Sequence, residues 1–546
     1  MQRLLVTIAA LALIGCGGAG EQADERISAE SIMKDVQALS SDDMEGRAAG
    51  TAGEDKAADY LQQRFEEIGL QPVEGSYVQG VRLVGTKKVA DKSQLTIAGS
   101  DGKEFEYVPD GTLTYWSTSQ KEVVDIQDAP LVFVGYGVEA PEHDWDDFKG
   151  QDVTGKVLLF LNDDPQVEGL FEGERRTYYG RWTYKFEQAM KHGAAGAIMI
   201  HTTPSASYGW SVIGHNGAEE GFALDISGSG YQVDLLGWID EDSSNRIAQS
   251  MGTDLEGLFE QGLSKDFQPV DTGYKVSAHI ETAIRRIETK NVVGMLEGSD
   301  AELKEQVIVF SAHYDHLGVN LDLEGEDKIF NGAWDNAAGT AGILSLAEAF
   351  KALPETPRRS ILFLACAAEE SGSLGSRWFV ANPPFERSRL VANFNIDMPQ
   401  IFGITADLSA IGVETSSLGD TLREAAAQFS VEGNPVAVKG DPNPGAGSFY
   451  RSDQVNFAKA GIPALFINPG TEFVPPLDFD PDEYEDGHYH QVADEVDERW
   501  DLVGLQRDLR IVFQAALSVA NHDEMPRWKP GNEFEEEWEK LHGEGK

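Results

Sequence analysis

A set of acidic and imidazole side chains in the second half of this 546-residue chain stands at the ends of apolar segments or beside predicted loops. The set comprises His313, Asp315, Asp335, Glu369, Glu370, Asp397 and His490. Most of its members directly follow the apolar runs 307–310, 361–367 and 391–396, which we interpret as strands. Ligands of open α/β sheets bind at the edge where strands end. The spacing therefore predicts that these side chains meet at one sheet edge.

The donor types indicate a site for two metal ions. Imidazole and carboxylate suit zinc, manganese or cobalt, and a chain with two cysteines cannot build a four-thiolate structural site. One carboxylate can be shared by two cations about 3.5–4 Å apart, and we assign that role to Asp335. His313 and Asp397 would complete the protein ligands of one ion, and Glu370 and His490 those of the other.

Two further carboxylates receive catalytic roles. Residues i and i+2 of an extended segment point the same way, so Asp315 can accept the second N–H of His313 and fix its tautomer. Adjacent residues point apart, so Glu369 can face a water as general base while Glu370 binds metal. Each residue alone has an ordinary alternative, such as a helix cap or a solvated acidic pair; the ordered set favours the metal site.

Nearby histidines are assigned with less support from their positions. His488 competes with His490 as the last ligand, and the sequence Tyr489-His490-Gln491 favours His490. His316 is expected to have a structural role or to lie behind the ligands.

The elements that position the set predict an α/β fold. After residue 291, apolar runs alternate with helical stretches, which is typical of a mostly parallel sheet covered by helices on both faces. Helices are predicted at 28–39, 54–68, 337–350 and 502–520. Residues 90–280 differ, because short strands there are broken by Gly and Asp. We therefore divide the chain into three parts. The main domain is formed by 27–89 and 281–530, the β-rich insert by 90–280, and a loosely held acidic tail by 531–546.

The N-terminus predicts export with a lipid anchor. Arg3 precedes an apolar run at 4–14, which is too short to span a bilayer comfortably. The residues before Cys16 resemble the bacterial lipoprotein box, so 1–15 is expected to be a signal peptide, Cys16 to be lipidated and 16–26 to be a tether. The expected location is the periplasm or outer membrane of a bacterium.

Composition limits the partners. The chain has 92 acidic and 44 basic residues, a formal net charge of −48. Such a surface repels nucleic acid and anionic lipid headgroups, so membrane contact is expected only through Cys16. The other cysteine, Cys366, lies in an apolar run and is expected to be a core residue.

The motifs around the site resemble peptidase family M28, the zinc aminopeptidases. They are SAHYDHLG (311–318), NGAWDN (331–336), AEESG (368–372), NID (395–397) and YHQ (489–491), in the family's order. The resemblance implies two Zn²⁺ ions, peptide substrates and hydrolysis of N-terminal residues. It also implies that Tyr489 polarises the scissile carbonyl. The insert resembles a protease-associated (PA) domain at 135–137 and 192–197.

Other functions of the same fold stay open. A carboxypeptidase would need a cationic pocket for the substrate carboxylate; Arg451 could provide one or could form an ordinary surface ion pair. A glutaminyl-cyclase-like enzyme would use one metal. A non-catalytic binding protein would be expected to have lost ligands, and none of the predicted ligands is missing.

Overall fold

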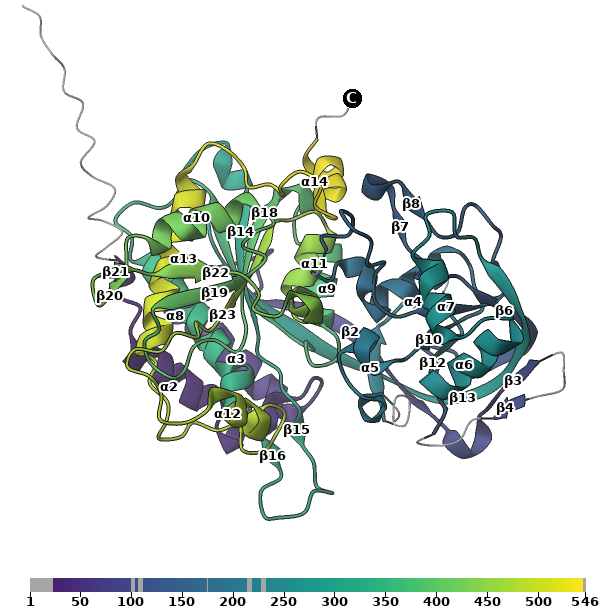
Figure 1. The fold of residues 1–546 in the computed structure, drawn as a ribbon. Coiled ribbons are helices and arrows are strands. Elements are labelled where there is room, and N and C mark those ends of the chain that lie inside the picture. Colours follow the sequence, from purple (N-terminus) through teal and green to yellow (C-terminus); the bar gives the residue numbers. More distant parts are fainter. Residues whose placement is uncertain are drawn as a thin grey trace, which may run out of the picture.

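The computed structural model describes residues 23–99, 104–106, 111–173, 175–213, 219–226 and 232–543. Figure 1 shows two lobes, one built from the N-terminal helices and the second half of the chain, the other from the middle of the chain. The predicted signal peptide and Cys16, the predicted site of lipidation, lie outside the described residues. Among the helices that are described, none is both long and apolar enough to cross a membrane.

The larger lobe contains a mixed sheet with a parallel centre. In spatial order its strands are β11 (Gly221–Leu224), β2 (Val78–Lys88), β13 (Val270–Leu296), β17 (Ser360–Cys366), β14 (Val307–His313), β18 (Leu390–Ile396), β23 (Ala464–Asn468), β19 (Asp407–Ile411) and β22 (Ala437–Lys439), with β1 (Gln71–Pro72) also on β13. The pairs β17–β14, β14–β18 and β18–β23 are parallel. Antiparallel pairing begins on either side, at β13 and β19. The predicted α/β class is confirmed.

Helices cover both faces of this sheet because its central strands bury both faces. In β14, Ile308 and Phe310 enter one core, whereas Val307 and Val309 enter another, as the two-residue period of a strand requires. The first core is closed by α2 (Ala29–Leu39), α3 (Ala52–Ile68), α8 (Gly339–Lys351), α10 (Ser417–Ala426) and α13 (Val503–Asn521). The second receives side chains of α9 (Leu374–Ala381) and α11 (Gln454–Lys459). Four of these helices match the predicted ones to within about two residues, the usual uncertainty of a helix end.

The smaller lobe contains a second sheet that shares β13 with the first. Its order is β4 (Glu104–Glu106), β3 (Gln94–Gly99), β13, β6 (Val123–Phe133), β9 (Val157–Leu161), β10 (Gly196–Ile200), β12 (Leu235–Ile239) and β5 (Leu113–Trp116). The helices are α4 (Trp182–Lys191), α5 (Thr203–Ala206), α6 (Glu241–Ser250) and α7 (Leu255–Gly262). The boundary predicted at 280 falls inside the 27-residue strand β13. A continuous strand, and not a linker, therefore joins the lobes there.

Small elements complete the fold. They are the hairpins β7–β8 (Glu139–Ala140, Trp145–Asp146), β15–β16 (Gly318–Val319, Ile329–Phe330) and β20–β21 (Ser430–Val431, Asn434–Pro435), with α12 (Pro481–His488) and α14 (Glu535–His542). The expectation of a loosely held tail is wrong at its start. Phe534 is buried, and the Glu533 carboxylate accepts hydrogen bonds from the Tyr450 hydroxyl and the Tyr178 N–H. These contacts attach the segment to both lobes.

Candidate metal centre

The Asp335 carboxylate lies between two histidines. Its Oδ1 is 3.2 Å from Nε2 of His313, and its Oδ2 is 3.3 Å from Nε2 of His490. Asp335 lies in the turn that leads into α8, and His313 is the last residue of β14. One carboxylate oxygen is thus directed at each imidazole, the arrangement expected of a ligand shared by two ions.

A second carboxylate accompanies each histidine. Asp397, directly after β18, places Oδ1 3.1 Å from Nε2 of His313. Glu370, after β17, places Oε2 3.1 Å from Nε2 of His490. The structure therefore brings together the five residues proposed as ligands, in the two groups expected from the sequence.

His316 also belongs to this cluster. Its Nδ1 is 2.7 Å from Oε1 of Glu370 and 3.9 Å from Oδ2 of Asp335, and the three residues satisfy the geometry of a metal-binding group, as do His313, Asp335 and Asp397. Its Nε2 is buried and has no hydrogen-bond partner among the described residues. The sequence predicted that His316 has a structural role or lies behind the ligands, and its spacing alone could not show that its ring turns toward Glu370.

His488, the alternative to His490, lies outside the cluster. Its Nδ1 lies 2.7 Å from the Tyr484 carbonyl oxygen, its ring stacks on Tyr484, and its Nε2 lies 3.1 Å from a guanidinium nitrogen of Arg499. With both nitrogens engaged there, His488 is not available as a ligand in this arrangement.

The Asp315 carboxylate forms hydrogen bonds with the turn that contains Glu369 and Glu370, and not with the His313 ring. Its carboxylate accepts the backbone N–H groups of Glu369 (3.0 Å) and Glu370 (3.4 Å). Nδ1 of His313 lies 3.9 Å from the Asp315 carboxylate but 3.2 Å from the Asp315 carbonyl oxygen. The expected contact assumed an extended segment, whereas β14 ends at His313. Asp315 therefore acts on the position of the proposed base and of one proposed ligand.

Glu369 and Tyr489 flank the cluster. One oxygen of Glu369, Oε1, accepts a hydrogen bond from the Ser373 hydroxyl at 3.0 Å. Burial and the nearby Glu370 charge raise the pKa of Glu369 well above its usual range, although His313 opposes the shift. The Tyr489 ring stacks on His490 with centroids 3.9 Å apart and is 44% exposed, so its hydroxyl is accessible to a substrate.

The electrostatics of the cluster fit a cation. Burial opposes charge on His313, yet Asp397 and Asp335 raise its pKa well above the usual range. Burial likewise opposes charge on His490, yet Asp335 and Glu370 raise its pKa to about 10. The carboxylates of Asp335, Asp397 and Glu370 thus concentrate negative charge that a bound dication would balance. The donor set suits zinc and related metals.

The buried guanidinium group of Arg47 contacts the loops that carry proposed ligands. Arg47 is fully buried, and it donates hydrogen bonds to the carbonyl oxygens of Leu39, Tyr314, Asn331 and Gly332. Three of these acceptors, at Tyr314, Asn331 and Gly332, belong to the two loops that carry His313 and Asp335. Burial lowers the pKa of Arg47 to about 10, even though nearby carboxylates oppose the shift. No local sequence pattern indicates these contacts, because the Tyr314 acceptor lies 267 residues away from Arg47 in the chain.

Replacing Arg47 with methionine is expected to destabilise the protein by about 3 kcal/mol, because several buried carbonyl oxygens lose a charged donor. Urea unfolding of the chelated protein measures this without a contribution from metal. Arg82→Met, at an exposed position on β2, is the matched control and should change stability little. Equal unfolding midpoints for the two variants would show that Arg47 has no such role.

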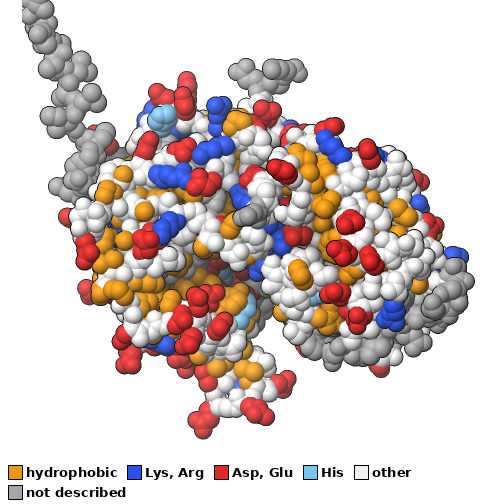
Figure 2. Space-filling view, in the orientation of Figure 1, with side chains coloured by type: hydrophobic (Ala, Val, Ile, Leu, Met, Phe, Trp, Pro, Cys, Tyr) orange, Lys and Arg blue, Asp and Glu red, His pale blue; other side chains and the backbone are white. Residues whose placement is uncertain are grey.

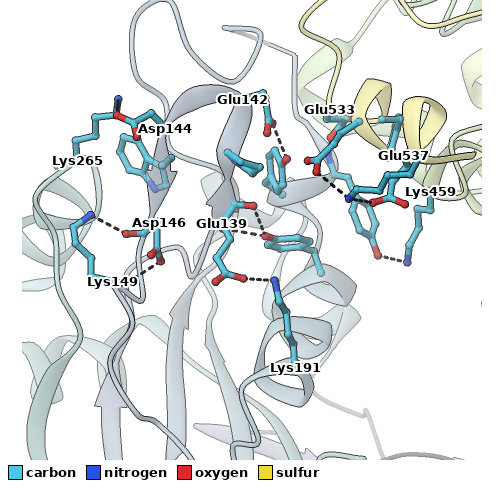
Figure 3. Close-up of a pocket in the computed structure, with 18 of the residues that line it drawn as sticks. Glu139, Glu142, Asp144, Asp146, Lys149, Lys191, Lys265, Lys459, Glu533 and Glu537 are labelled. Atoms are coloured by element: carbon cyan, nitrogen blue, oxygen red, sulfur yellow. Dashed lines mark hydrogen bonds and ion pairs between the residues drawn. The ribbon is translucent and has the colours of Figure 1, made fainter. Parts of the chain in front are cut away.

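One cavity lined by many charged side chains lies away from this cluster. About 970 Å³ in volume, it is bounded by β7–β8, α4 and the C-terminal segment, and no proposed ligand lines it. Its charges are paired, for example Lys191 with Glu139 at 2.5 Å and Lys265 with Asp144 at 3.2 Å (Figure 3). A second cavity of about 1000 Å³ adjoins the ligands, because Trp334, Pro399 and Phe402 line it. The second cavity is the better candidate for holding part of a substrate.

Comparison with known proteins agrees with the site. Residues 291–515 match the profile of peptidase family M28, and every proposed ligand lies within that range. The chain is 25% identical to aminopeptidase YwaD of Bacillus subtilis (strain 168) over 464 residues, which cover 84% of this chain and 79% of that protein. It is 25% identical to aminopeptidase NAALADL1 of Mus musculus over 174 residues, which cover 29% of this chain and 21% of that protein. The solved aminopeptidase of Aneurinibacillus sp. strain AM-1 superposes with a TM-score of 0.49 at 19% sequence identity. The superposition covers 93% of this chain and 97% of that one.

The fold and the site define a peptidase domain with a candidate metal centre. The match agrees with the resemblance seen in the sequence: residues 291–515, which carry the centre, match the profile of peptidase family M28. The family match does not extend over 90–280, where the resemblance to a PA domain stays a prediction.

Proposed function

We propose that this protein is a dinuclear zinc aminopeptidase that removes residues from the N-termini of peptides. The observation that carries the proposal is Asp335, with one carboxylate oxygen directed at His313 and the other at His490. The family M28 match and the similarity to aminopeptidase YwaD support the reaction class.

The residues of the site have distinct tasks. His313 and Asp397 would hold one ion, Glu370 and His490 the other, and Asp335 both. Bound ions would polarise the scissile carbonyl and make water a better nucleophile. His316, which contacts Glu370, either orients that carboxylate or takes a ligand position beside His490.

Glu369 is the proposed general base and acid. The Ser373 hydroxyl holds Oε1, which leaves Oε2 to take a proton from the attacking water and deliver it to the leaving amine. Asp315 keeps this carboxylate in place through the Glu369 N–H. The Tyr489 hydroxyl would donate a hydrogen bond to the oxyanion that develops on the substrate carbonyl.

A panel of aminoacyl chromogenic amides, with N-acetyl versions beside them, tests this function. Free-amine substrates are expected to be hydrolysed, N-acetyl ones not, and a chelator should abolish the activity until zinc is added back. Cleavage of an N-blocked peptide at its last bond would instead favour the carboxypeptidase. One metal ion per chain would favour the cyclase-like enzyme, and a chain without metal or turnover would favour a binding protein.

We further propose that the protein is exported and anchored by lipid at Cys16, on the basis of the apolar run and glycine before this residue. Cys16→Ser is expected to abolish labelling by a radioactive fatty acid and to move the protein from the membrane fraction to the soluble one. Cys366→Ser is the matched control, because the thiol of Cys366 is buried in the core. Fatty-acid labelling that survives Cys16→Ser would exclude this anchor.

A further inference from the structure

Arginines from both lobes act on one another electrostatically. Arg181 begins α4, Arg176 lies in the preceding loop, and Arg451 lies in the main domain just before α11. The main-domain segment 444–446 accepts hydrogen bonds from the Arg176 N–H at 3.1 Å and from the Arg451 guanidinium at 3.0 Å. The charges of Arg451 and Arg176 act on Arg181, and all three arginines act on the Tyr208 phenol. Figure 2 shows Lys and Arg side chains where the two lobes meet. Side chains distant in sequence thus form a cationic cluster, which we define as Arg176, Arg181 and Arg451.

Carboxylates do not neutralise every charge of this cluster within the described part of the chain. Arg176 is engaged, with Nε 2.9 Å from Oδ1 of Asp163 and Nη2 donating to the Ser205 carbonyl oxygen. Within the described part of the chain, neither Arg181 nor Arg451 has a carboxylate partner. The buried Nε of Arg181 likewise lacks a hydrogen-bond acceptor among the described residues.

This lack of counter-charge is unusual in such an acidic chain. Acidic residues outnumber basic ones by 92 to 44, so a carboxylate partner would be easy to supply. Burial and the repulsion of Arg451 lower the pKa of Arg181 to about 10, so its charged form bears a cost. Buried groups that stay unsatisfied call for an explanation, and a ligand that completes the cluster is one.

The cluster is connected to the metal centre through one residue. Ser452 follows Arg451, and its hydroxyl donates a 2.7 Å hydrogen bond to Oδ2 of Asp397, a proposed metal ligand. A cationic cluster repels the ammonium group of a peptide N-terminus and attracts a carboxylate. It therefore suits the part of a substrate that follows the scissile bond, and not the part that precedes it.

We propose that the Arg176–Arg181–Arg451 cluster binds a carboxylate of the peptide substrate, on the C-terminal side of the bond that is cut. This rests on the proposed peptidase function. Guanidinium groups bind a carboxylate through paired charge-assisted hydrogen bonds, and the Tyr208 phenol, on which all three arginines act, can donate another. The carboxylate can be the C-terminus of a short peptide or the side chain of an Asp or Glu that follows the cleaved residue.

The experiment compares three peptides with the same N-terminal leucine: Leu-Ala with a free C-terminus, Leu-Ala amide and Leu-Glu amide. For the unmodified holoenzyme, kcat/KM is expected to be about tenfold or more higher for a carboxylate-bearing peptide than for Leu-Ala amide. A preference for Leu-Ala identifies the C-terminal carboxylate as the ligand, and a preference for Leu-Glu amide identifies the side chain. In Arg181→Met the ratio of kcat/KM for the carboxylate-bearing peptide to kcat/KM for Leu-Ala amide should fall toward one, mainly because KM for the carboxylate-bearing peptide rises. Arg181→Lys should restore part of this ratio.

Lys191→Met is the matched control, because it removes one positive charge from the far end of α4 and should keep the preference. Metal content and melting temperature of Arg181→Met show whether the variant is folded. Equal kcat/KM for all three peptides in the unmodified enzyme, or an unchanged preference in folded Arg181→Met, would overturn the inference. Hydrolysis of none of the peptides or chromogenic amides would instead count against the proposed function.

Discussion

Replacing Glu369 with glutamine is expected to lower kcat for an aminoacyl chromogenic amide by about 10²–10⁴-fold while both metal ions stay bound. Glutamine keeps the size of the side chain and can still accept the Ser373 hydrogen bond, but it cannot take a proton from water. The carboxylate contacts no proposed ligand in its present position. Steady-state kinetics measure the loss, and elemental mass spectrometry counts the metal.

Glu370→Gln is the comparison for that variant, because the neighbouring carboxylate contacts His490 and His316. This substitution is expected to lower metal content as well as activity. The two adjacent glutamates would then separate proton transfer from metal binding. If Glu369→Gln keeps kcat within about tenfold of the unmodified enzyme, its loss is below the range of general base catalysis and the base is another group.

Replacing Asp335 with asparagine is expected to remove both metal ions and to bring activity below detection. Asparagine offers one neutral oxygen and an amide nitrogen that cannot bind metal, whereas each oxygen of Asp335 faces a different histidine. The negative charge that favours a dication decreases as well. Metal counting after dialysis against limiting zinc, with the chromogenic amide assay, measures both effects.

Asp397→Asn provides the graded comparison, because Asp397 contacts only one of the two histidines. It is expected to weaken one ion more than the other, so that about one ion per chain remains at limiting zinc. Asp322→Asn, at an exposed position between β15 and β16, controls for loss of negative charge and should keep both ions. Two tightly bound ions in Asp335→Asn would show that Asp335 is not the shared ligand.

Local patterns were enough to predict the elements and the ligand types. The apolar runs at 307–310, 361–367 and 391–396 predicted strands, because a strand buried on both faces needs nearly continuous apolar side chains. A polar side chain directly after such a strand lies at the sheet edge whatever the remaining packing. Asp397 and Glu370 therefore lie where the sequence indicated.

The geometry between elements depended on the tertiary structure. Asp315 was expected to hold the His313 ring, but the end of β14 turns its carboxylate toward the Glu369 and Glu370 N–H groups. His316 joins the cluster because its ring turns toward Glu370, a rotation that no spacing encodes. These differences arise where a strand has ended and packing decides the path of the loop.

By itself, the sequence determined the α/β class, the order of the strands along the chain and the metal-binding character of the site, because apolar periodicity and donor chemistry are local properties. Only the tertiary structure decided which atoms meet. It brought the Arg47 guanidinium into contact with two loops that carry proposed ligands. It also brought Arg181 of one lobe close enough to Arg451 of the other for their charges to interact. Such contacts join residues more than 250 positions apart in the sequence. They form only when the pairing of β13 and the packing of the two cores bring these residues together.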